Sequence, residues 1–340
     1  MPRTQTLQRR RSPLGTAAGS LLTRRTLVLA LAAVALLALP LVLTDSYSRN
    51  LAILVLVYAV VASSWDVTVG TAGIFNMGHV AFFGLGAYAS GIAANELGVS
   101  PWLGLLIGTV VAVIASVIAF LPAIRLRGIY VSLVTFAFAQ LAVHLVLSQS
   151  KYTGGHSGLA GLPTFELFGI NLNGNARLGA YYLIAIIFVA SLLLLRAYLR
   201  SRYGLALLAL KDYEEYAMSR GVPVVRYRLG SFMVSAAVAG LVGSFYAHYL
   251  GVVSVEVFSF SLMSLMLTLI LVGGMGTLYG PIVGSVLVTI GYELLFDLGV
   301  WRFVVMAALI IVTTRFLPEG MWPWIERLWR RPSASSSAAE

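Results

Sequence analysis

The sequence contains no cysteine and few charged residues. Without cysteine, the 340-residue chain can form no disulfide, no cysteine-ligated metal site and no thiol nucleophile. Charged residues make up only 11% of the chain, whereas soluble domains carry about 25%. This scarcity excludes a soluble enzyme, a disordered protein and a nucleic-acid-binding domain.

The chain is also poor in the residues that carry out most catalysis. Neither of its two lysines, Lys151 and Lys211, follows the glycine that a phosphate-binding loop requires. The four histidines are scattered and lack the spacing of metal ligands. The glycine-rich run at 154–158 is better explained as a loop than as a nucleophile elbow. We therefore expect no enzymatic activity and no cofactor.

Apolar residues, by contrast, form 59% of the chain. A transmembrane helix needs about 20 of them, and the apolar runs here are continuous rather than alternating as in a β-barrel. Ten runs have spanning length, which predicts an all-α polytopic membrane protein. The predicted spans are residues 26–44, 51–69, 73–95, 101–121, 128–148, 179–198, 229–250, 261–277, 281–298 and 302–317.

The basic residues support this count and orient it. With ten spans and both termini in the cytoplasm, 19 of the 23 Lys and Arg residues lie inside and four lie outside, as the positive-inside rule requires. The Arg-rich start could instead be a secretory signal or a transit peptide. Residues 43–47 offer no small-residue cleavage site, however, so we expect a retained first span.

This topology divides the chain into a basic cytoplasmic tail at 1–25, a transmembrane domain at 26–317 and a cytoplasmic tail at 318–340. Two connecting segments within the domain are long. Residues 149–178, rich in Gly and Asn, would lie outside as an ordered lid, a docking loop or a flexible connection. Residues 199–228 form the only sizeable charged segment inside, and they predict a short amphipathic helix.

Two glycine-interrupted stretches, at 70–88 and 273–281, lie in the two halves of the chain. Broken helices in both halves are typical of a transport pathway, but tight packing through small residues would give the same composition. Three acidic residues near span ends, Asp66, Glu293 and Asp297, fit either solvated side chains or an ion pathway. At this level a transporter and a closely packed bundle are both open.

Nine blocks of sequence carry a resemblance to a known family. They are Gly73–Tyr88, Arg125–Tyr130, Thr135–Phe138, Thr153–Gly155, Gly158–Pro163, Lys211–Glu214, Ser235–Gly243, Tyr246–His248 and Gly273–Pro281. From about residue 50 to 317, the chain resembles the M-type membrane subunits of bacterial branched-chain amino acid ABC importers. Each block alone is a weak signal, whereas their common order is a specific one.

The resemblance implies a role for the charged segment. In that family a cytoplasmic loop docks on a separate ATPase through a Glu-Ala-Ala-x3-Gly motif, which Glu215, Ala217 and Gly221 match, with Tyr216 replacing the first alanine. The implied coupling loop contains Lys211, Asp212, Glu214, Glu215, Ala217 and Gly221. On one continuous helix Lys211 and Glu215 would share a face, and we expect Gly221 to end that helix with positive φ.

The resemblance also implies a machine with separate partners. These are two ATPase subunits, a second homologous permease subunit and an external solute-binding protein, either periplasmic or lipid-anchored, all serving a permease in the bacterial inner membrane. As residues of the pathway for zwitterions with apolar tails, we single out Asn76, His79 and Gln140. Three glycines are expected to serve packing: Gly78, Gly84 and Gly86.

Two alternatives remain at this point. Close relatives in the family move urea or short amides, and the pocket of the binding protein, rather than the permease, decides between those solutes and branched-chain amino acids. From another class, the chain could be a stand-alone, ion-coupled secondary carrier that uses Asp66, Glu293 or Asp297.

Overall fold

The computed structural model describes residues 36–43, 45–167, 169–295 and 320–330, with isolated positions between 299 and 317. The chain forms two compact units, Met1–Asp45 and Ser46–Glu340. In the first unit, residues 36–42 are helical. All the elements named below belong to the second unit.

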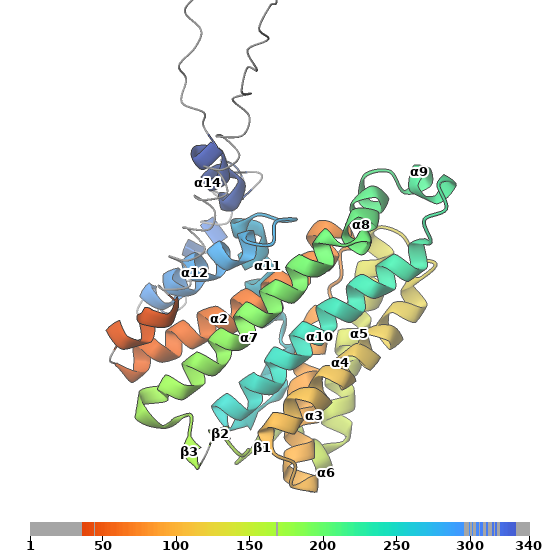
Figure 1. Ribbon diagram of the computed structural model, residues 1–340. Coiled ribbons are helices and arrows are strands. Elements are labelled where there is room, and N and C mark those ends of the chain that lie inside the picture. The colour runs from red at the N-terminus through yellow and green to blue at the C-terminus, as the bar shows by residue number, and fades with distance from the viewer. Residues whose placement is uncertain are drawn as a thin grey trace, which may run out of the picture. The chain divides into compact units, whose positions relative to one another are not determined.

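The second unit consists almost entirely of helices (Figure 1). Its longer helices are α2 (Ser46–Asp66), α3 (His79–Leu97), α4 (Pro101–Ala123), α5 (Ile129–Ser148), α7 (Gly174–Arg200), α8 (Arg202–Asp212), α10 (Val224–Leu250), α11 (Phe260–Gly273), α12 (Gly280–Leu294) and α14 (Met321–Arg330). Its shorter elements are the π-helix η1 (Val67–Thr71), α6 (Ser150–Thr153), η2 (Gly155–Ser157), β1 (Leu159–Ala160), β2 (Glu166–Leu167), β3 (Ile170–Asn171), α9 (Glu214–Ser219), β4 (Val252–Val253) and η3 (Val255–Phe258).

Several of these helices have the length and apolar composition of membrane spans. Five qualify: Ser46–Thr71, Pro101–Ala123, Ile129–Ser148, Ala176–Arg200 and Val224–Leu250. The helices α11 and α12 are apolar but shorter. The predicted all-α polytopic membrane fold is therefore confirmed. The predicted first and tenth spans, 26–44 and 302–317, fall largely outside the described residues, so the count of ten stays a prediction.

Two predicted spans include residues that lie outside a helix. The third span begins at His79 rather than at 73, and the eighth ends at Gly273 rather than at 277. Glycines explain both differences, because Gly73 has φ +68° and Gly274 has φ +118°. Neither value continues a right-handed helix. The surrounding residues stay apolar, so hydropathy does not reveal where the helix stops.

Small residues bring the central helices together. The helices α3, α4 and α10 pack against one another, and α2 contacts α7, α10 and α12. A Cβ added to Gly86 of α3 would lie 2.5 Å from Cα of Gly240 in α10, and one added to Gly108 of α4 would lie 2.5 Å from the Gly86 carbonyl oxygen. Such close backbone approach is how helices associate in a bilayer. Gly78 and Gly84 also touch neighbouring groups closely, so all three predicted packing glycines are confirmed.

The long segment 149–178 is folded onto the end of α10. Strand β1 pairs antiparallel with β4, with Leu159 opposite Val253, and β2 and β3 form a small hairpin. The buried Phe165 ring lies 5.2 Å from Trp102 and 5.6 Å from His248, centroid to centroid. The described part of this segment is therefore an ordered cover, and the alternative of a flexible connection was wrong.

The described connections lie at two opposite ends of the helices. Figure 1 shows α6 and β1–β3 at one end, and α8 and α9 at the other. In the predicted C-terminal tail, α14 packs against α11 and α12, and its Trp322 ring lies 5.2 Å from that of Tyr279. The 1–25 tail, Asp297 and residues 331–340 lie outside the described residues. Glu293 accepts a hydrogen bond from the Tyr47 hydroxyl.

Candidate functional site

The first glycine-interrupted stretch forms a break between α2 and α3. After Asp66 the helix widens into η1, a π-type turn that is often found at functional sites. From 72 to 78 the chain leaves the helix altogether, turning at Gly73. The Asn76 side chain holds the last turn, because its Oδ1 accepts a hydrogen bond from the Gly78 amide at 2.9 Å. We call residues 67–78 the first break.

The second glycine-interrupted stretch separates α11 from α12. Residues 274–279, the second break, contain Gly274 and Gly276, both with positive φ. Thr277 closes this turn: its hydroxyl donates to the Gly274 carbonyl at 2.8 Å and accepts from the Gly280 amide at 3.1 Å. The paired breaks predicted from the two halves of the sequence are both present.

The two breaks touch each other. Oδ1 of Asp66 accepts a hydrogen bond of 2.8 Å from the Gly276 amide. A Cβ added to Gly70 would lie 2.2 Å from the Gly276 nitrogen, so the two backbones are in direct contact. Asp66 is only 2% exposed, and the prediction that it could be a solvated carboxylate was wrong. Its role here is to hold the second break against the first.

Lys211 joins the charged segment 199–228 to this contact. Its ammonium donates a 2.6 Å hydrogen bond to the Gly70 carbonyl. Its stem passes over Gly73, where an added Cβ would lie 2.9 Å from Cγ of the lysine. A charged donor to a buried carbonyl is among the stronger hydrogen bonds in proteins. One side chain therefore ties α8 to the first break.

The single amphipathic helix predicted for the charged segment is in fact two helices. Tyr213 has φ −146° and ψ 80°, which ends α8 and starts α9. Lys211 and Glu215 therefore do not share a face, and the predicted pairing of these two residues was wrong. Gly221 ends the short helix with φ +82°, as expected.

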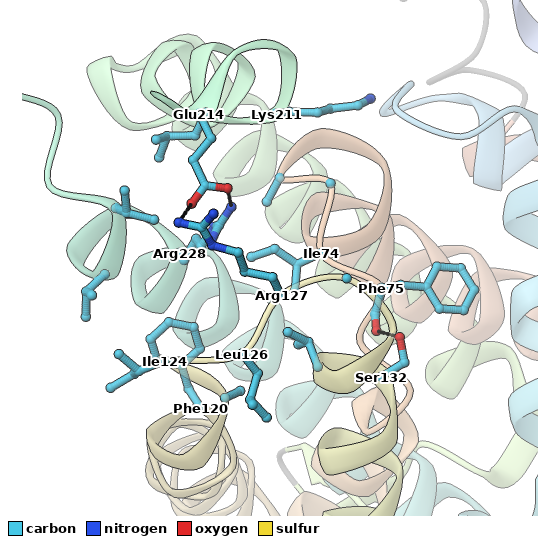
Figure 2. Close-up of a pocket in the computed structure, with 18 of the residues that line it drawn as sticks. Ile74, Phe75, Phe120, Ile124, Leu126, Arg127, Ser132, Lys211, Glu214 and Arg228 are labelled. Carbon is cyan, nitrogen blue, oxygen red and sulfur yellow. Dashed lines mark hydrogen bonds and ion pairs between the residues drawn. The ribbon is translucent and has the colours of Figure 1, made fainter. Parts of the chain in front are cut away.

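The described contacts of α9 separate an inward face from an outward one. Glu214 pairs with Arg228 at 2.8 Å and lies 3.9 Å from Arg127 (Figure 2). Ala217 is buried at 3% exposure, whereas Glu215 and Tyr216 point to the surface, the tyrosine being 64% exposed. Asp212, at the end of α8, is also exposed.

Two of the three predicted pathway residues lie together, Asn76 within the first break and His79 directly after it. His79 is fully buried and stacks on Trp65, with 5.5 Å between ring centroids. Its Nε2 lies 3.1 Å from the Ser64 hydroxyl, and its Nδ1 lies 3.3 Å from that of Ser235. Asn76 joins this group, because its carbonyl accepts a 2.6 Å hydrogen bond from the Trp65 indole.

The third predicted residue, Gln140, lies apart. It is half-buried on α5, and among the described residues it makes none of the hydrogen bonds that hold the His79 group. Within the described residues, Nδ2 of Asn76 is buried and has no hydrogen-bond partner. Also within that part of the chain, no three His, Asp or Glu side chains gather to hold a metal ion.

The sequence did not predict the residues that contact His79 and Asp66. Trp65 and Ser64 lie within an apolar span, where nothing marks them as contacts of a histidine 15 positions away. The Asp66–Gly276 bond joins residues 210 positions apart. The one sequence feature that could have indicated this bond was an acidic residue, Asp66, close before a glycine-rich stretch.

Comparisons with known proteins show which family the chain resembles. A family model described as branched-chain amino acid transport system, permease component, matches residues 47–314. The high-affinity branched-chain amino acid transport system permease protein LivM of Escherichia coli (strain K12) is 28% identical over 295 residues, which cover 81% of this chain and 69% of that protein. LivM of Salmonella typhimurium is 28% identical over 297 residues, covering 81% and 70%. No solved structure matches the chain significantly.

The family match includes both breaks, the charged segment and the five span-length helices, except for Ser46, the first residue of the first helix. It therefore covers the membrane-embedded part of the structure rather than one motif. The chain belongs to the family of branched-chain amino acid transport system permease components.

Proposed function

We propose that this chain is a permease subunit of an ABC importer for branched-chain amino acids. It spans the bacterial inner membrane ten times, with the tails 1–25 and 318–340 in the cytoplasm and the domain 26–317 in the membrane. Residues 149–178 form the external cover, and residues 199–228 form the cytoplasmic coupling loop. The charge asymmetry of 19 inside to four outside supports this orientation.

The partners follow from the same proposal. Two separate ATPase subunits supply the energy, a second homologous permease completes the pore, and an external binding protein delivers leucine, isoleucine or valine. Both relatives carry the name of a branched-chain amino acid permease. The sequence itself lacks the Gly-Lys-Ser/Thr of a nucleotide-binding loop, which fits an ATPase on another chain.

The 2.6 Å hydrogen bond between Lys211 and the Gly70 carbonyl carries this proposal. The outward face of α9, with Glu215 and Tyr216, docks on the ATPase. A movement of that subunit displaces α8, and Lys211 passes the displacement to the first break. Because Asp66 binds the second break there, one movement separates or closes the Gly70–Gly276 contact.

This contact acts as a gate for the solute. With the gate closed, Asn76 and His79 are sealed in the bundle beside it. When the gate opens, Nδ2 of Asn76, which has no hydrogen-bond partner among the described residues, and the imidazole are available to the polar end of an amino acid. Gln140 on α5 is a further pathway candidate, facing the same solute at a later position.

The two lysines of the chain allow a matched test. Lys211→Met removes the donor to Gly70 and should lower ATP-driven leucine uptake by tenfold or more, since a charged hydrogen bond contributes about 1.5–3 kcal/mol. Lys151→Met makes the same chemical change in the segment 149–178 and should transport at the wild-type rate. Uptake is measured in vesicles that contain the chain with its ATPases, second permease and binding protein.

The same vesicles separate the competing functions. Urea uptake in place of leucine uptake would replace the substrate assignment. Accumulation driven by a proton gradient without ATP, and abolished by Asp66→Asn, would replace the importer with an ion-coupled carrier. Equal transport by both lysine variants would show that the contact with Gly70 does not transmit motion.

A further inference from the structure

A cavity of about 460 Å³ lies beneath α9, on the side that faces the helix bundle. Its walls are the first break, the turn between α4 and α5, the start of α10 and the α8–α9 junction (Figure 2). The volume is within the range of about 300–1,000 Å³ that is typical of small-molecule sites. None of the pathway candidates lines it, so this cavity is separate from the His79 group.

One wall of the cavity is charged. Glu214 binds Arg228 at 2.8 Å through Oε2, whereas its Oε1 has a cation only at 3.9 Å, from Arg127. Nε of Arg228 is buried and has no hydrogen-bond partner among the described residues. The Lys211 ammonium is already bound to the Gly70 carbonyl. The cavity therefore offers two guanidinium groups and one carboxylate with spare hydrogen-bonding capacity.

Most of the other residues that line the cavity are apolar. Ile74 comes from the first break, Phe120 and Leu126 from the α4 end and the following turn, and Val224 from the start of α10. A ligand that fits this cavity must present a negative group, a positive group and an apolar body at short range of one another.

We propose that this cavity binds a free aliphatic α-amino acid from the cytoplasm and that its occupancy slows import. The α-carboxylate binds the guanidinium groups of Arg127 and Arg228, the α-ammonium binds Oε1 of Glu214, and the aliphatic side chain packs on Ile74 and Phe120. The identity of the amino acid as the transported solute rests on the proposed function. An anionic lipid fits less well, because the Glu214 carboxylate repels a phosphate group, whereas it attracts the ammonium group of an amino acid.

The effect on transport follows from where the ligand binds. It would connect α9, through Glu214, to the α4–α5 turn and to α10, through Arg127 and Arg228. These additional charge-assisted bonds hold α9 in the position seen here. A ligand that binds one conformation in preference shifts the population toward it, so accumulated product holds the gate closed.

Binding is tested first on the purified full chain in nanodiscs of phosphatidylcholine. The probes are leucine, 4-methylpentanoate (the same carboxylate and tail without the ammonium) and 3-methylbutylamine (the same tail and ammonium without the carboxylate). By equilibrium dialysis, leucine should bind at least tenfold more tightly than either. Arg127→Gln should weaken leucine binding about tenfold or more, whereas Arg125→Gln, a residue outside the cavity wall, should leave it unchanged.

Arg127 is 70% exposed, so its substitution is compatible with folding, and near-wild-type thermal stability verifies this. Saturable leucine binding that needs both ionic groups and Arg127 supports the site. Equal binding of 4-methylpentanoate, or displacement of leucine by phosphatidylglycerol, identifies an anion or lipid site and overturns the proposal. Equal leucine binding by wild type and Arg127→Gln also overturns it.

Inhibition is then measured in vesicles of the assembled importer, preloaded with leucine on the side of the ATPases. Internal leucine should slow uptake in the wild type and in Arg125→Gln, and much less in Arg127→Gln, each relative to its own rate without internal leucine. Uptake that is insensitive to internal leucine contradicts this inference but leaves the proposed function intact. Absence of leucine uptake in unloaded vesicles contradicts the proposed function instead.

Discussion

At the scale of single residues, the Gly70–Gly276 contact leaves no room for a methyl group. A Cβ on Gly70 would lie 2.1 Å from Asp66 Oδ1 and 2.2 Å from the Gly276 nitrogen. The first neighbour is the carboxylate that holds the two breaks together, and the second is main chain. Neither can yield without separating the breaks.

We expect Gly70→Ala to destabilise the protein by about 1–3 kcal/mol, the usual cost of overpacking. The matched control is Gly291→Ala in α12, where an added Cβ meets nothing within 4 Å and where alanine favours the helix. Thermal unfolding of the purified variants in detergent should show a lowered midpoint for the first only. An unchanged midpoint for Gly70→Ala would contradict the close contact.

At the scale of elements, the Tyr213 break lets one segment perform two tasks. Helix α8 keeps Lys211 on the first break, while α9 carries Glu215 and Tyr216 at the surface. One continuous helix could not do both, because residues four apart on a helix share a face. The break thus separates the internal contact from the proposed docking face.

The proposed docking face can be tested with two substitutions. Glu215→Arg reverses an exposed charge, and Gly221→Val places a side chain at φ +82°, which costs about 1 kcal/mol and redirects the end of α9. Both variants should insert normally yet lose ATPase co-purification and leucine uptake. Gly161→Val, at φ +72° with nothing within 4 Å, imposes the same backbone cost at the other end and should keep both activities.

Assembly and transport at wild-type levels by both α9 variants would make 199–228 a simple connector. Loss of assembly by Gly161→Val as well would point to a general folding defect rather than to docking.

At the scale of the whole molecule, the two folded connections lie at opposite ends of the helices (Figure 1). Ser157 is exposed at one end and Ser219 at the other. Because the chain has no cysteine, single cysteines at these positions can be labelled without further mutations. In intact cells, a membrane-impermeant maleimide should label Ser157→Cys and not Ser219→Cys, and permeabilisation should expose the second. Labelling of both in intact cells would contradict the proposed topology.

Local sequence information was enough to predict the fold class and several elements of this protein. Hydropathy is a sum over neighbouring residues, so the class, the existence of the described spans and the two glycine-rich breaks could all be predicted. The order of the motif blocks indicated the family. The positive φ of Gly221 followed from a glycine at the end of a short helix.

Tertiary structure alone decided how these parts meet. Lys211 bonds a carbonyl 141 positions away, and Asp66 an amide 210 positions away. The residues next to Lys211 and Asp66 in the sequence do not indicate either bonding partner. The same holds for the burial of His79 against Trp65 and for Tyr213 dividing the charged segment, since both depend on what packs beside the chain. Helices arise from local periodicity, but the Gly70–Gly276 contact, the proposed gate, depends on which two backbones touch, and that is settled only when the whole bundle packs.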